Sequence, residues 1–227
     1  ILAEAPVKRI VWREEEAGGR RVADGIEIVM TDGRKRFVKA RKGVVVAAGA
    51  LNSSRILDAS GIEGTGEGMS LNIACPVVAL MPEGRSVKAW DEDQMATYVD
   101  RGDFLLESHF QPPMSMSTLM PGWFGDHAMR MVNYNRMASA GILVPADRCG
   151  RMRGGALSFK LRDDVELPLI RRALATLTRV HFAAGAIEVY PGLARGRAIR
   201  PGDDVDAFFA DAIGEADDIV LSSSHPQ

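Results

Sequence analysis

The chain has 227 residues, a formal net charge of -2 at pH 7 and 46% hydrophobic residues. A chain of this length buries a core without disulfide or metal staples. Its acidic and basic residues are interspersed, which excludes a strong electrostatic attraction for nucleic acid or an anionic membrane surface. We therefore expect a small, largely uncharged molecule as its partner.

The cysteines and the hydropathy pattern limit which kinds of stabilising site and which cellular location the chain can have. Cys75 and Cys149 are far apart and lack metal-ligand spacing, which argues against a metal site and a disulfide framework. No apolar run approaches the roughly 20 residues that span a bilayer, and the first residues lack the features of a signal peptide. These observations predict a cytoplasmic protein without a membrane span.

The first forty residues predict a small antiparallel meander. Residues 5–12 and 24–31 alternate between apolar and polar side chains, as half-buried strands do. Asp32-Gly33 is typical of a hairpin turn, and residues 35–42 return as a third strand.

A strand, a tight turn and a helix are expected next. The Val-rich run at 43–50 predicts a strand that is buried on both faces of a parallel sheet. Residues 52–54 then supply a helix N-cap, and Gly61 ends the helix.

Beyond Pro76 the pattern predicts an antiparallel sheet with one face covered by helices, so the expected class is α/β, with an α+β second domain. The expected strands are 75–82, 103–110, 139–145, 151–159 and 186–190, and the expected helices are 125–137, 164–183 and 203–215.

The segment 44–62 carries the first chemical motif. It reads VVVAAGALNSSRILDASGI, which resembles the late part of the flavin domain in the glucose–methanol–choline (GMC) oxidoreductase family. Small residues at the end of a buried strand let a dinucleotide approach the backbone. The resemblance thus implies that the cofactor is FAD and that Ala47, Ala48, Gly49 and Ala50 bind it, whereas a tightly packed core without a ligand explains the same residues.

Asn72 is the next candidate contact. Residues 66–72 resemble the glycine-rich loop with an Asn that follows this helix in the family, although Ile73-Ala74 stand where many members have a His. The resemblance implies a flavin contact through Asn72, and a solvated loop with a turn-forming Asn is the alternative. The glycines at 64–68 lack the third glycine of a phosphate loop and follow no strand.

The end of the chain carries the second motif. Residues 219–227, ending His225-Pro226-Gln227, resemble the catalytic His-Pro segment of the family. A histidine with a pKa near neutrality suits the transfer of a hydroxyl proton. The resemblance implies that His225 is catalytic and that Pro226 lies at the cofactor, whereas an arbitrary histidine here would be a solvent-exposed bystander.

The other histidines and the methionines give weaker indications. His109 precedes a Pro-Met-rich loop that could line a substrate pocket, His181 is expected to be a hydrogen-bonded core residue, and His127 is expected at the surface. The methionines suit a hydrophobic alcohol, and ordinary core filling explains them equally well. They are Met114, Met116, Met120, Met129, Met131 and Met137.

The resemblance extends over the whole chain. It implies part of an FAD-binding domain at 1–72, a substrate-binding domain at 73–198 and a return to the FAD domain at 199–227. The chain would be a portion of an enzyme that transfers a hydride from an alcohol to FAD, and it would be inactive alone because its pyrophosphate loop lies upstream.

Two alternatives stay open. In the first alternative, the chain is a non-catalytic module that binds an apolar ligand or another subunit. In the second, it is part of another two-domain flavoprotein, whose donor is a sugar or a sterol. The sequence predicts neither the electron acceptor, nor the particular alcohol, nor the oligomeric state.

Overall fold

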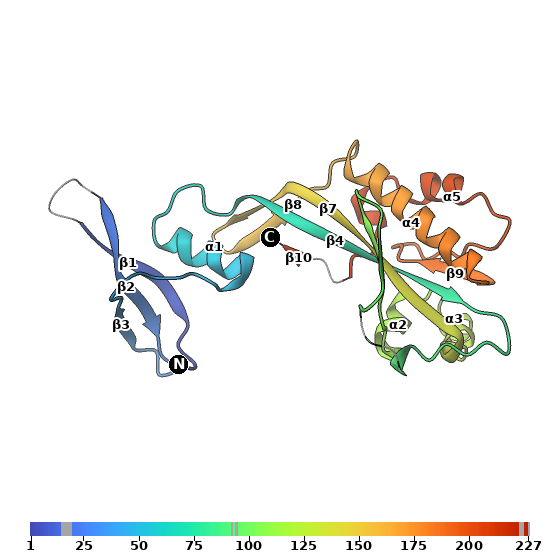
Figure 1. Ribbon diagram of the computed structural model, residues 1–227, viewed down its shortest axis with the longest axis horizontal. Helices are drawn as coiled ribbons and strands as arrows, with labels where there is room; N and C mark the ends of the chain where they lie inside the picture. Colours follow the sequence, from blue (N-terminus) through green and yellow to red (C-terminus); the bar gives the residue numbers. More distant parts are fainter. Residues whose placement is uncertain (15–19, 92, 94, 223–224, 227) are drawn as a thin grey trace. The chain divides into compact units, whose positions relative to one another are not determined.

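The computed structural model describes residues 1–14, 20–91, 93, 95–222 and 225–226. The chain divides into two compact units. Unit 1 comprises Ile1–Met69, Gly150–Phe159 and the last two residues, and unit 2 comprises Ser70–Cys149 and Lys160–His225. Helices and antiparallel strands occur together, which confirms the α/β class (Figure 1). The domain limits expected after residues 72 and 198 stay predictions.

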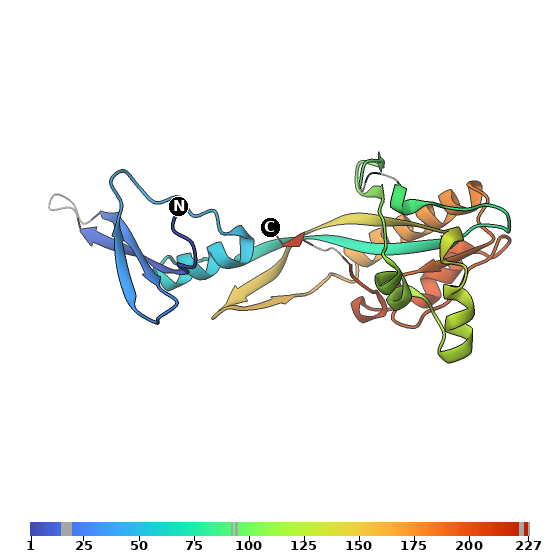
Figure 2. The same ribbon diagram turned by 90° about the horizontal axis from the view of Figure 1, so that it is seen from below.

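Unit 1 contains the expected meander. Strands β1 (Val7–Glu14), β2 (Arg21–Val29) and β3 (Lys35–Lys39) pair antiparallel in the order β1-β2-β3. Helix α1 (Gly49–Ala59) packs against β1 (Figure 2). The residue after this helix makes the attachment: Ser60 Oγ accepts the Ile10 N–H at 2.7 Å, and Trp12 Nε1 donates to the Ser60 carbonyl at 2.7 Å.

The strand expected at residues 43–50 is wrong. Residues 43–47 form no strand, and the Val45 side chain is 91% exposed. A strand buried on both faces needs hydrogen-bonded neighbours at its sides and layers above and below it. Among the described residues no strand pairs with this segment, so its apolar composition alone does not produce a strand.

The start of α1 also differs from the expectation. The helix begins at Gly49, so residues 52–54 lie inside it and do not cap it. Ser53 instead reaches back, and its Oγ accepts the Ala48 N–H at 3.1 Å. The expected end is confirmed, because Gly61 follows the helix with φ 72° and its N–H donates to the Asp58 carbonyl.

Most strands of a seven-stranded sheet lie in unit 2, whereas the strand at Ala156–Phe159 belongs to unit 1. The path of the sheet is β10-β4-β7-β6-β5, with β8 paired to β7 and β9 paired to β4. The pairs β4·β9, β5·β6, β6·β7 and β7·β8 are antiparallel, as expected. The strands are β4 (Glu67–Leu80), β5 (Tyr98–Asp100), β6 (Leu105–Ser108), β7 (Met137–Arg153), β8 (Ala156–Phe159), β9 (Glu188–Pro191) and β10 (His225–Pro226). The sequence did not predict β5, and β4 begins well before the expected start at residue 75.

Helices lie on both faces of this sheet. In Figure 1, α4 (Glu166–Ala183) lies on one side of β4 and β7, and α2 (Pro113–Leu119) and α3 (Phe124–Met131) lie on the other. The two-residue period of β4 explains this arrangement. Ile73 and Val77 join α4 in the main core, whereas Val78 and Leu80 pack with Met116 of α2 in a second cluster.

The structure confirms one predicted helix, shortens two others and contains one that was not predicted. The helix expected at 164–183 is confirmed as α4, and that at 203–215 is the shorter α5 (Val205–Ala212), whose first turn is capped by the Asp204 side chain. The helix expected at 125–137 ends at Met131, and α2 was not predicted. Throughout the described ranges, no helix combines the length and apolar character that a membrane crossing requires.

Candidate functional site

The predicted cofactor residues Ala47, Ala48 and Gly49 are exposed where α1 begins, and Ala50 is half-buried. Gly49 has φ 75°, and a Cβ placed on it would meet no atom within 4 Å. The backbone is thus open to the close approach of a ligand at this point, and these residues fit the group that the motif implies.

Asn72 lies within β4, which corrects the expectation of a solvated loop. Its neighbours Leu71 and Ile73 are buried in the core that α4 covers. Successive side chains of a strand point to opposite faces, so the half-buried Asn72 side chain belongs to the other face of the sheet.

Backbone hydrogen bonds fix the segment that leads to His225. The Ala194 N–H donates to the Asp218 carbonyl, the Val220 N–H to the Gly192 carbonyl and the Ser222 N–H to the Ala74 carbonyl, each at 2.9 Å. His225 and Pro226 then form β10, which pairs with β4. The fold therefore brings His225 onto the strand next to the one that carries Asn72.

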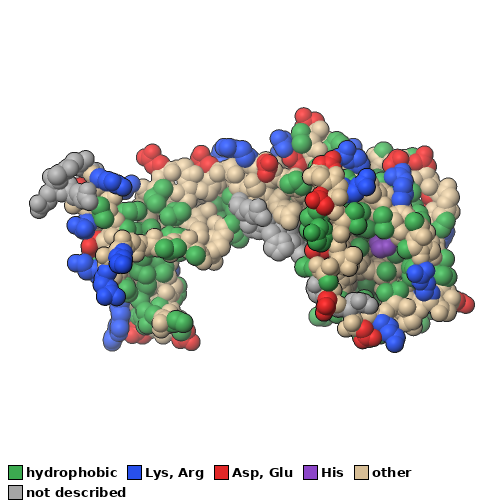
Figure 3. Space-filling model, viewed as in Figure 1, with side chains coloured by type: hydrophobic (Ala, Val, Ile, Leu, Met, Phe, Trp, Pro, Cys, Tyr) green, Lys and Arg blue, Asp and Glu red, His purple; other side chains and the backbone are tan. Residues whose placement is uncertain are grey.

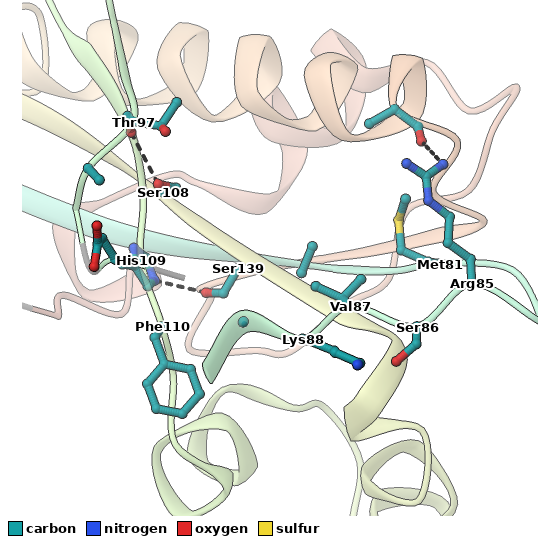
Figure 4. A pocket seen from close by; sticks show the side chains of 15 residues that line it. Met81, Arg85, Ser86, Val87, Lys88, Thr97, Ser108, His109, Phe110 and Ser139 are labelled. Atoms are coloured by element: carbon teal, nitrogen blue, oxygen red, sulfur yellow. Dashed lines mark hydrogen bonds between the residues drawn. The ribbon is translucent and has the colours of Figure 1, made fainter. Parts of the chain in front are cut away.

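Unit 2 has a pocket of about 640 Å³ with a polar pair inside it (Figure 4). His109 Nε2 lies 2.9 Å from Ser139 Oγ, and Ser139 is buried. Burial lowers the pKa of His109 to about 4, so the imidazole is neutral near pH 7. Apolar side chains of Met81, Val87, Phe110 and Ala138 also line the pocket.

The pairing of β6 with β7 positions His109. Ser108 is the register partner of Ala140, so His109 comes next to Ser139, and its N–H donates to the Ser139 carbonyl at 3.3 Å. The imidazole lies against Gly141: a Cβ there would be 2.9 Å from His109 Cε1 and 3.1 Å from Nδ1. The missing side chain at position 141 makes room for the ring.

Charged side chains lie at the rim of this pocket. Arg85 is exposed and donates at 2.7 Å to the carbonyl of Ala184, the C-cap residue that follows α4 (Figure 4). Such a cation also interacts favourably with the carboxyl end of the helix dipole. Lys88 and Asp93 are the other ionisable side chains of the lining besides His109, and both are exposed. The polar groups inside are thus uncharged, whereas the ionic groups remain in solvent.

The sequence indicated part of this site. The sequence suggested that the Pro-Met-rich loop after His109 lines a pocket, whereas in the structure His109 itself and Phe110 are among the lining residues. Ser139 and Gly141 were missed, because only the long-range pairing of β6 and β7 brings them to His109. No local motif marks either residue.

The remaining histidines differ in their surroundings. His181 is buried as expected, but its Nε2 has no hydrogen-bond partner among the described residues, so the expected hydrogen bond is wrong. His127 is half-buried, with Nε2 2.8 Å from the Ser117 carbonyl oxygen. In the described ranges, no three His, Cys, Asp or Glu side chains come together as metal ligands.

The methionines divide between core and surface. Met116, Met120 and Met137 are buried around Val78 and Leu80, while Met114 and Met129 are exposed. Core filling accounts for the buried ones. On the face of unit 2 shown in Figure 3, acidic and basic side chains are intermixed, so no single charge dominates that face.

Comparison with known proteins shows which family the chain resembles. Residues 1–75 match the sequence model of the GMC oxidoreductases. That match includes residues 47–50 and Asn72. The matches support membership of the GMC oxidoreductase family.

Two kinds of relative align with the chain. An uncharacterized GMC-type oxidoreductase of Mycobacterium tuberculosis is 29% identical over 203 residues, which cover 85% of this chain and 31% of the relative. The long-chain-alcohol oxidase FAO1 of Arabidopsis thaliana is 24% identical over an alignment of 259 residues, which covers 99% of this chain and 33% of the relative. The chain thus spans about a third of the length of the curated relatives it matches.

Proposed function

We propose that the chain is part of an FAD-dependent oxidoreductase that oxidises the CH–OH group of an alcohol. The match of residues 1–75 to the GMC family carries this proposal, because it contains the small-residue motif at 44–62. The name of the Arabidopsis relative supports a long-chain alcohol as the substrate.

The chain's own residues take defined roles in this proposal. Bound FAD would supply the acceptor for a hydride from the alcohol carbon. The open backbone at Ala47–Ala50 would lie against the cofactor, together with Asn72 and Pro226. His225 would accept the hydroxyl proton, since a neutral imidazole is a suitable base near pH 7.

The proposal is tested on the full-length gene product, obtained by sequencing beyond residues 1 and 227. We expect the purified protein to show flavin absorbance and to oxidise dodecan-1-ol in the presence of a redox dye. His225→Ala should lower kcat by roughly 10²- to 10⁴-fold while the flavin content stays unchanged, as expected for a lost general base.

His127→Ala is the matched control, because His127 contacts the Ser117 carbonyl and lies outside the proposed machinery. A colourless full-length protein would contradict the FAD assignment. Unchanged kcat in His225→Ala would contradict the role of that residue alone.

One observation favours a second candidate, a non-catalytic module that binds an apolar ligand. The described residues that line the pocket around His109 all belong to unit 2, so these walls are present without a cofactor. Ligand binding by a full-length protein that lacks both flavin and alcohol oxidation would select this alternative.

A further inference from the structure

Acidic and basic residues are interspersed over the chain as a whole, but one segment of unit 1 is strongly basic. Residues 34–42 read RKRFVKARK, with six basic residues and no acidic one. The segment forms β3, an edge strand whose five residues are all exposed, and continues past its end. Lysines on an exposed edge strand prevent pairing with other chains, which explains Lys35 and Lys39. Arg41 and Lys42 follow the strand, so this explanation does not extend to them.

The residues after β3 line a pocket of about 490 Å³. The Ala40 N–H donates to the Asp24 carbonyl at 2.8 Å, which holds this segment beside the start of β2. β1 lies along the other edge of β2, where Arg13 pairs with Val22. The described pocket lining therefore comes from three neighbouring segments of unit 1, at residues 13, 22–24 and 39–42.

This pocket carries an excess of positive charge. Its described lining has four basic side chains and one acidic side chain, Asp24, whose carboxylate forms an ion pair with Arg13 at 3.6 Å. Within the described ranges, no ion pair or side-chain hydrogen bond occupies Lys39, Arg41 or Lys42. Three cations thus line one concave site without a described counter-charge, and an anion in the pocket would neutralise them.

We propose that this pocket binds a phosphate monoester group. Such a group carries a charge of roughly -1.5 to -2 near neutral pH and three strong acceptor oxygens, so it meets several cations at once. The guanidinium of Arg41 matches two of these oxygens in a fork, and the ammonium groups of Lys39 and Lys42 act as point charges. A carboxylate has a single negative charge and would leave more of the cations without a partner. Binding of this kind needs neither flavin nor an alcohol, so it does not depend on the proposed oxidation.

Calorimetric titration of the full-length gene product with glycerol 3-phosphate tests the site. At pH 8 and low ionic strength we expect saturable binding that weakens with added salt, because the three cations are exposed. Arg41→Gln should weaken binding by roughly three- to tenfold, as expected for the loss of one charge-assisted contact. The matched control is Arg36→Gln, at an exposed arginine of β3 outside the described lining. It removes the same charge and should weaken binding by less than about twofold.

Two further probes identify the chemistry and the source of the group. Glycerate carries a carboxylate in place of the phosphate, and we expect it to bind at least roughly threefold more weakly. Vesicles of phosphatidylcholine with phosphatidic acid present the same phosphate monoester on a lipid, and flotation measures binding of the protein and of both variants to them. Binding to the vesicles alone would identify a lipid head group, and binding of glycerol 3-phosphate would identify a soluble ester. Either result supports the proposal.

Three results would overturn the proposal. The first is that neither glycerol 3-phosphate nor the vesicles bind. The second is an equal loss in Arg41→Gln and Arg36→Gln, which would mean that the overall charge of unit 1, and not the pocket, attracts the anion. The third is glycerate binding as tightly as glycerol 3-phosphate, which would identify a carboxylate site.

Discussion

The absence of a side chain at Gly141 decides where the His109 ring can lie. An added Cβ would be 2.9 Å from Cε1 and 3.3 Å from the Cys75 carbonyl oxygen, and the second contact is with backbone that cannot move easily. We expect Gly141→Ala to displace the imidazole, to break its hydrogen bond with Ser139 and to lower the free energy of unfolding by roughly 1–3 kcal/mol, the usual cost of overpacking. Urea unfolding and the ¹⁵N shifts of His109 measure the two effects.

Gly125→Ala is the matched control for this substitution. Gly125 lies in α3, and a Cβ there would meet nothing within 4 Å. Alanine is also the better helix former, so this variant should be as stable as the unaltered chain or slightly more stable. Equal losses in the two variants would show that close packing at Gly141 does not hold His109.

His181 makes the stability of the fold depend on pH. Burial and the nearby His109 lower the pKa of His181 to about 4, whereas an unfolded histidine has a pKa near 6.5. The unfolded chain therefore binds more protons between pH 6.5 and pH 4, so stability is full above 6.5 and falls as the pH falls through this window. The loss of stability that His181 causes across this window is on the order of 3 kcal/mol.

His181→Leu tests this linkage. The variant should lose less stability than the unaltered chain between pH 6.5 and pH 4, when free energies of unfolding are compared by urea titration. It also removes a buried Nε2 without a described partner, so its stability at pH 7 should change little beyond repacking. If the free energies of unfolding of the two proteins depend on pH in the same way, the pKa of His181 does not differ between the folded and unfolded states.

At the residue scale, the sequence predicted those features that depend on neighbours along the chain. The helical spacing of His181 placed it in the core, and the burial of that residue is confirmed. Its hydrogen bonding could not be predicted, because the partners of Nε2 depend on side chains from other elements. Ser139 and Gly141 became recognisable only through strand pairing, and the role of His225 stays a prediction.

At the scale of elements, the first residue of α4, Glu166, forms an ion pair with the half-exposed Arg162. Glu166 is buried and accepts the Arg162 N–H at 2.7 Å and Arg162 Nε at 2.9 Å. Burial raises the pKa of Glu166, but the hydrogen bonds and charge of Arg162 outweigh this effect, so the pKa lies below its usual value. The guanidinium of Arg162 thus stabilises the ionised carboxylate inside the fold.

Arg162→Met should therefore destabilise the protein by roughly 1–3 kcal/mol, since a buried charged acceptor is left poorly satisfied. The control is Arg179→Met on the same helix, whose partner Asp206 is exposed, and that loss should be below about 1 kcal/mol. Urea unfolding at pH 7 measures both. A smaller loss in Arg162→Met than in Arg179→Met would contradict the anchoring role.

The elements differ in how strongly the local sequence specifies them. α4 was predicted because its apolar residues recur at helical spacing and its core face follows directly from that period. The Val-rich run at 43–47 failed as a strand, because a strand requires hydrogen-bonded neighbours that no local pattern supplies. The helix after it begins at Gly49 without the expected cap, and Ser53 lies inside the helix, where its Oγ accepts the Ala48 N–H.

At the scale of the whole molecule, the two units bury very different cores. The large buried side chains are concentrated in unit 2, whereas unit 1 relies mainly on Ile10 and Ile28 of the meander, with Met69 and Met152. The sequence predicted an antiparallel sheet covered by helices from its alternation. It did not predict that residues 150–159 belong to the same unit as the N-terminal meander. That grouping depends on long-range pairing, because the boundary between the units falls within the long strands β4 and β7.

This difference in burial predicts a difference in local opening. α4 buries nine of its 18 residues, whereas α1 has 11 residues and buries none. An isolated helix of that length is marginal in water, so α1 should open locally while the core of unit 2 remains folded. We expect amide hydrogen exchange by mass spectrometry to be at least roughly 100-fold faster in α1 than in α4.

α3 also buries no residue although it belongs to unit 2, so it should exchange as fast as α1. Slow exchange in α3 beside fast exchange in α1 would mean that membership of a unit, and not side-chain burial, controls opening.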